Sequence, residues 1–157
     1  MLQTTMEKQV RQALHTVRTA IERCPEPLWR AGKGEYLVIA RLAFHVLQAI
    51  DYHLDAHPDQ FDWNAHGIDW EGSAPDALWD QARTLAYLDE IQAKAYAYVA
   101  DEAGLLSGDV SLRFFVSRLG RCLLRDHLCY VLRHTAQHTG EINSLLCQAG
   151  APVGSWL

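Results

Sequence analysis

Apolar residues recur about every 3.6 positions along most of the chain, which is the period of an α-helix that packs on one side. The first such segment runs from Met6 to Ile21 and stops at residues 24–27, where two prolines interrupt the pattern. The spacing predicts a second helix over residues 35–56, because Pro58 disfavours helical backbone just before it.

Two further helices are predicted in the second half of the chain. Residues 73–76, Ser-Ala-Pro-Asp, resemble a capping box, so a third helix is expected from there to about Ala103. Residues 110–149 have a helical composition throughout, but one straight helix of that length would span roughly 60 Å. We therefore expect a break near Gly120 and a long last helix that ends at Gly150.

The segment between the second and third helices, residues 58–75, is rich in Pro, Gly, Asp and Trp and predicts a long ordered loop. Its tryptophans, Trp63 and Trp70, either shape a functional pocket or cover the end of the helices. Four long amphipathic segments with short connections predict an all-α protein, a four-helix bundle that forms one domain over residues 1–157.

The composition and charge of the chain limit the classes of binding partner that can be expected. Of the 157 residues, 49% are apolar and 21% are charged, and the net charge is −5 without any run of basic residues. Nucleic-acid binding is not expected, since it needs a cationic surface. No apolar stretch reaches the length of a membrane span or a signal peptide, so a cytoplasmic protein with no membrane partner is predicted. In a reducing cytoplasm its four cysteines are expected to be buried thiols.

The strongest chemical signal is a pair of histidines in the last predicted helix. His134 and His138 are four residues apart, so both imidazoles lie on one helix face and can bind one metal ion at about 2.0–2.1 Å. His45 lies on the predicted core face of the second helix, between Leu42 and Ala49. Alone it reads as a core histidine, but with the pair it predicts a three-histidine site that leaves the ion one open position.

Two more residues of the last helix are candidates for catalysis. Glu141 can ligate the ion, orient a ligand or act as a base, although an exposed helix acid is the alternative. His127 lies two turns before His134, about 10 Å along the axis, which is too far to bind the same ion. It has either a role in the pocket or a packing role in the interior.

The remaining histidines carry weaker signals. His53 and His57 stand at the expected end of the second helix, where the helix dipole favours cations in solvent. His15 and His66 have no partner in the sequence and are expected at the surface or in the loop.

At these residues the chain resembles the DinB-like superfamily, small bacterial proteins named for a DNA-damage-inducible member. The resemblance rests on the stretch around His45 and on residues 134–142, which read His-Thr-Ala-Gln-His-Thr-Gly-Glu-Ile. It implies an antiparallel four-helix bundle, often a homodimer, and a divalent ion, commonly nickel or zinc, held by His45, His134 and His138.

The resemblance also suggests a reaction. The superfamily includes transferases that use bacillithiol or mycothiol and a mycothiol-dependent maleylpyruvate isomerase. We therefore expect a metal-dependent transfer of a small-molecule thiol to an electrophile, with Trp63, Trp70 or Tyr52 shaping the pocket. The alternatives are a hydrolase that uses metal-bound water, a non-catalytic protein stabilised by its ion, and a bundle without a physiological metal.

Overall fold

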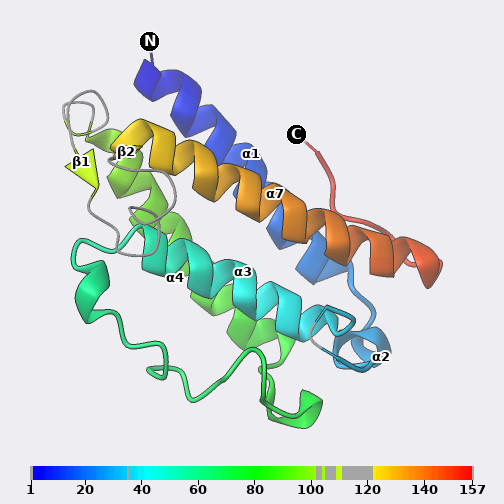
Figure 1. Ribbon diagram of the computed structural model, residues 1–157. Coiled ribbons are helices and arrows are strands. Elements are labelled where there is room, and N and C mark those ends of the chain that lie inside the picture. The colour runs from blue at the N-terminus through cyan, green and yellow to red at the C-terminus, as the bar shows by residue number, and fades with distance from the viewer. Residues whose placement is uncertain (1, 35, 102–103, 105–108, 111–121, 157) are drawn as a thin grey trace.

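The computed structural model describes residues 2–34, 36–101, 104, 109–110 and 122–156. Within them the fold is mainly α-helical, so the all-α prediction is confirmed (Figure 1). The long helices are α1 (Leu2–Arg23), α3 (Ile39–His53), α4 (Gln81–Ala100) and α7 (Leu124–Gln148).

These helices share one apolar core. Helix α1 packs against α4 and α7, and α3 packs against the same two helices from the other side. Each helix contributes side chains with almost no exposed surface, and the largest of them are Ile21, Leu42, Phe44, Leu47, Leu88, Ile91, Leu128, Ile142 and Leu146. The apolar residues whose spacing predicted the helices are therefore the ones that these helices bury.

The first two predicted helices are present with different boundaries. The second begins at Ile39, because Val38 has extended backbone and accepts the first helical hydrogen bonds from Arg41 and Leu42. It ends at His53 and not at residue 56. A short helix that the sequence did not predict, α2 (Glu26–Trp29), starts within the proline-containing stop signal, because proline is tolerated in a first turn.

The predicted start of the third helix is wrong. Helix α4 begins at Gln81, where the Asp80 side chain accepts a hydrogen bond of 2.8 Å from the Arg83 amide. Ser73 is part of a turn instead, and its hydroxyl accepts a bond of 3.0 Å from the Asp69 amide. The capping signal failed because a Ser can close a loop turn as readily as it caps a helix.

Residues 54–80 therefore form a loop longer than predicted, with 3-10 turns at Pro58–Gln60 and Pro75–Ala77. Ile68 and Leu78 anchor it in the core. Side chains of the helical part also bind its backbone carbonyls, among them Gln48, which donates to the Trp63 carbonyl at 2.8 Å. These contacts support the prediction of an ordered loop.

The last helix ends as predicted, with α7 closing at Gln148 just before Gly150, which has a φ of 69°. The predicted break at Gly120 lies outside the described residues. A pair of short antiparallel strands, β1 (Asp109–Val110) and β2 (Cys122–Leu123), precedes α7 and was not predicted. No helix in the described part of the chain is long and apolar enough to cross a membrane.

Among the three cysteines whose side chains are described, the prediction of buried thiols is correct for Cys24 and wrong for Cys129 and Cys147. Burial raises the pKa of the Cys24 thiol to about 11, so it is an inert core residue at neutral pH. Cys129 and Cys147 are exposed on α7, because they lie on the face opposite to the one that packs on the core.

Candidate metal centre

The packing of α3 against α7 brings the three predicted histidines together. One ring nitrogen of each of His45, His134 and His138 lies within 4.8 Å of the other two. The ring centroids of His45 are 5.3 Å from His134 and 4.7 Å from His138. Residues about 90 positions apart in the sequence thus form one cluster, here called the histidine triad.

The pair on α7 has the spacing of two ligands of one ion. The Nε2 atoms of His134 and His138 are 3.2 Å apart. Two nitrogens bound tetrahedrally at 2.0–2.1 Å would be separated by about 3.3 Å, so this pair could accept an ion with little movement. The donor set of three imidazoles suits zinc, nickel, copper or iron better than magnesium or calcium, which prefer oxygen ligands.

Glu141 fixes which nitrogen of His138 is available. Its Oε2 lies 2.7 Å from His138 Nδ1, and an ionised carboxylate can only accept, so the hydrogen is on Nδ1. The lone pair is then on Nε2, which faces His134. A carboxylate that orients a metal-binding histidine in this way also raises its basicity. Of the roles considered for Glu141, this contact favours orientation of a ligand.

Burial keeps two members of the triad, His45 and His134, neutral at neutral pH. Desolvation, together with the neighbouring His138 and His134, lowers the pKa of His45 to about 3. Desolvation lowers the pKa of His134 to about 4. Neutral imidazoles have a free lone pair at neutral pH, which is the form that binds a metal ion. The residues present therefore fit a divalent ion.

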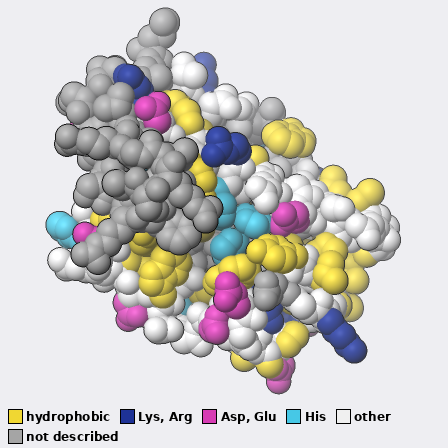
Figure 2. Space-filling view, in the orientation of Figure 1, with side chains coloured by type: hydrophobic (Ala, Val, Ile, Leu, Met, Phe, Trp, Pro, Cys, Tyr) yellow, Lys and Arg dark blue, Asp and Glu magenta, His cyan; other side chains and the backbone are white. Residues whose placement is uncertain are grey.

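Aromatic rings border the triad. The Trp70 indole from the loop lies 4.0 Å from the His45 ring, and the Tyr36 ring is parallel to His138 at 6.3 Å. Tyr130 stacks on His134 at 5.8 Å. Figure 2 shows histidine side chains reaching the surface on this face, with hydrophobic side chains and an acidic one beside them. Of the triad, His45 and His134 are partly exposed and His138 is buried, so the cluster lies close to the surface.

The other tryptophan of the loop has a different neighbour. Trp63 is 46% exposed and lies 4.6 Å from Tyr52, and neither ring is in contact with a triad histidine. Of the three aromatic residues predicted to shape a pocket, only Trp70 borders the triad. Tyr36 and Tyr130 were missed; Tyr130 lies four residues before His134, a spacing that could have indicated the contact.

His127 lies in the interior beside a histidine that the sequence misassigned. Its Nε2 is 3.1 Å from His53 Nδ1, and both side chains are buried. The prediction that His53 is solvated at a helix end is therefore wrong, because α7 covers that end of α3. For His127 the contact favours the interior role over a place in the pocket. His57 is exposed, as predicted.

The two histidines without a histidine partner in the sequence, His15 and His66, are placed partly as predicted. His66 belongs to the loop, but it is half-buried and lies 4.5 Å from the Tyr87 ring and 5.0 Å from the Trp79 ring. It therefore helps to fasten the loop to the core. His15 on α1 lies 3.2 Å from the Ser155 hydroxyl.

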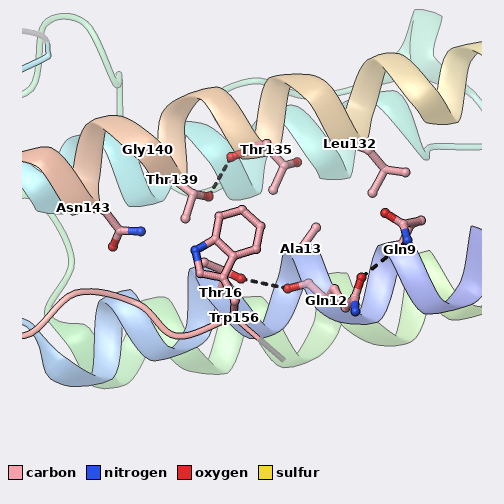
Figure 3. Close-up of a pocket in the computed structure, with 11 residues that line it drawn as sticks. Gln9, Gln12, Ala13, Thr16, Leu132, Thr135, Thr139, Gly140, Asn143 and Trp156 are labelled. Carbon is pink, nitrogen blue, oxygen red and sulfur yellow. Dashed lines mark hydrogen bonds between the residues drawn. The ribbon is translucent and has the colours of Figure 1, made fainter.

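A hollow between α1 and α7 is separate from the triad (Figure 3). It has room for about 150 Å³, and none of its described lining residues is a histidine. Its Thr135 and Thr139 hydroxyls donate to carbonyls of their own helix, at 2.8 and 2.6 Å. No donor set comparable with the triad is found there.

No family model matches the chain, and no curated protein matches it either. The argument about function therefore rests on the geometry of the triad.

The metal-free protein should lose stability as the pH falls from about 7 to about 4. The pKa values of His45 and His134 are about 3 and about 4 in the folded state but about 6.5 when unfolded. The unfolded chain therefore binds more protons in this window, and each such histidine lowers the free energy of unfolding by up to ~1.4 kcal/mol per pH unit. Urea unfolding in chelator at several pH values measures the slope.

Replacement of one titrating histidine should flatten that slope. His134→Gln removes one buried imidazole, whereas His57→Gln removes an exposed one and should leave the slope unchanged. An unfolding free energy that is constant between pH 7 and pH 5 would contradict the assignment of buried, neutral imidazoles.

Proposed function

We propose that this protein is a metal-dependent enzyme of the DinB-like kind, an antiparallel four-helix bundle that transfers a small-molecule thiol to an electrophile in the cytoplasm. The observation that carries the proposal is the convergence of His45, His134 and His138 from two helices on one point. Three neutral imidazoles leave a bound zinc or nickel ion with an open position, which is typical of catalytic and not of structural sites.

Such an ion, when bound, would supply Lewis acidity that lowers the pKa of a thiol at the open position. The residues of the chain have other tasks. Glu141 holds His138 with its Nε2 lone pair toward the cluster. Trp70 and Tyr36 offer apolar surface on which the carbon part of a substrate can lie. In the transfer, the sulfur–carbon bond forms while the leaving group departs with its electron pair.

The proposal also includes a base that accepts the proton of the thiol. Glu141 is the better candidate, because its side chain is 34% exposed and lies beside the triad. His127 is bound to His53 in the interior, and burial lowers its pKa to about 4. A weakly basic, enclosed imidazole is a poor acceptor for a proton that is released at the mouth of the site.

The proposal includes a homodimer, as the resemblance implies. It is supported by large apolar side chains that remain exposed, among them Leu37, Trp63 and Trp156, because exposed apolar surface is often covered by a partner. The dimer is independent of the metal site, and neither part of the proposal depends on the other.

The purified protein should bind about one zinc or nickel ion per chain. His45→Ala, His134→Ala and His138→Ala should each reduce the bound metal to a small fraction, because two imidazoles hold an ion far more weakly than three. Elemental analysis after dialysis measures the stoichiometry, and His57→Ala is the matched control. Full stoichiometry with unchanged affinity in any triad variant would remove that residue from the site.

Glu141→Gln should weaken metal binding by about 10- to 100-fold without unfolding the protein. The amide keeps the size of the side chain but no longer holds His138 with a charged acceptor. Calorimetric titration with zinc measures the affinity, and Glu90→Gln, the same change at an exposed acid of α4, is the control. Equal affinities of Glu141→Gln and wild type would show that the hydrogen bond is incidental.

The metal-loaded protein should transfer a thiol at a rate that chelation and His138→Ala both abolish. The measurement is a screen of bacillithiol, mycothiol, glutathione and coenzyme A against several electrophiles, with rates followed over pH. Metal-dependent cleavage of an ester or amide without thiol transfer would instead support the hydrolase. A protein that binds the ion but turns over neither class would support the non-catalytic alternative.

A further inference from the structure

Arg41 is a buried cation on α3, one helical turn before His45. It is only 5% exposed, and no carboxylate in the described part of the chain forms an ion pair with it. Burial of a charge without an opposite charge is costly, so an apolar side chain would be the stable choice if the position only filled space. The guanidinium therefore has a specific partner to bind.

That partner is the turn that carries Trp70. The two terminal nitrogens of Arg41 donate to the backbone carbonyls of Trp70 and Ser73. The turn is closed on itself, since the Ser73 amide donates to the Asp69 carbonyl at 2.9 Å and the Ser73 hydroxyl accepts from the Asp69 amide at 3.0 Å. The rigid fork of an arginine can hold two carbonyls at once. One side chain thus clamps the whole turn to α3.

Through the Trp70 indole, the clamp links Arg41 to His45 on the same helix, α3. Trp70 leaves the clamped turn and lies 4.0 Å from the His45 ring, while its edge meets Tyr36 at 5.9 Å. His45 is the triad member whose ring makes no hydrogen bond with another described side chain, whereas Glu141 holds His138 and His134 contacts His138. Outside the triad itself, the Trp70 indole is the described ring that packs against His45 and limits its rotation.

We propose that Arg41 is a positioning residue of the metal centre. It clamps residues 69–73, holds the Trp70 indole against His45, and so keeps the His45 ring facing His134 and His138. This inference rests on the proposed metal site. Loss of the clamp should weaken metal binding about tenfold, the lower end of the effect of residues that orient metal ligands.

Arg30 supplies a matched control. Its Nε and Nη2 donate to the Leu78 carbonyl at 3.0 and 2.6 Å, so it is a second arginine that fastens the same loop by its backbone. Leu78 lies at the end of the loop that leads into α4, outside the turn that carries Trp70. Arg30→Met should lower the melting temperature to an extent similar to Arg41→Met but leave metal affinity unchanged.

The test is a double-mutant cycle on metal affinity. Zinc is titrated by calorimetry into wild type, Arg41→Met, Trp70→Ala and the double variant, with thermal unfolding as a check of the fold. Each single change should weaken binding about tenfold, and the double variant should be no weaker than Trp70→Ala, because Arg41 acts through the indole. Nickel should quench tryptophan fluorescence in wild type, less in Arg41→Met and least in Trp70→Ala.

Arg41→Lys keeps one charged donor and should recover part of the lost affinity, and it carries the test if Arg41→Met does not fold. Unchanged zinc affinity and nickel quenching in Arg41→Met, or additive losses in the double variant, would overturn the positioning role while leaving the metal site in place. A wild-type protein that binds neither zinc nor nickel would overturn the metal site and this inference together.

Discussion

The contact between α3 and α7 determines what the rest of the molecule can do. His45 meets His134 and His138, whereas His53, farther along α3, meets His127, farther back on α7. The two helices therefore run antiparallel, with a register set by the apolar side chains that both helices bury in the common core. A slip of one turn would move a helix by about 5.4 Å and separate the three ring nitrogens beyond the reach of one ion.

The same contact costs stability in the absence of a ligand. Two Nε2 atoms at 3.2 Å can share only one hydrogen, so the lone pairs of the triad cannot all be satisfied by the triad itself. Water is partly excluded, which is why the pKa values of His45 and His134 fall and the rings stay neutral. An ion that accepts three lone pairs at once would stabilise this arrangement.

The sequence predicted the parts of the fold that depend on local periodicity and missed those that depend on tertiary contacts. The helical faces and the His134–His138 pair followed from spacing, because i,i+4 positions share a face whatever surrounds them. His45 was added to the pair because it lies on the predicted core face of its own helix. His53 was placed in solvent because its environment comes from α7, more than 70 residues away. The start of α4 was misplaced because Leu78 is buried as part of a loop held by Arg30, not as part of a helix. Arg41 gave no signal at all, since a buried arginine that binds carbonyls looks like a surface arginine in a sequence.

Charge decides which fourth ligand the triad would favour. Three neutral imidazoles leave the charge of a divalent ion uncompensated. The nearby charges of the described residues include Glu141, which acts through His138, the buried Arg41, and Arg133, whose guanidinium lies over the Tyr130 ring that stacks on His134. An anionic ligand is therefore favoured over a neutral one, which suits a thiolate and a hydroxide equally well. The aromatic residues that border the triad distinguish a thiolate ligand from a hydroxide. Sulfur is polarisable and gains from contact with rings such as Trp70 and Tyr36, whereas a hydroxide is strongly hydrated and gains nothing there. The apolar rim thus supports the proposed thiol ligand, with the carbon chain that carries it, over water.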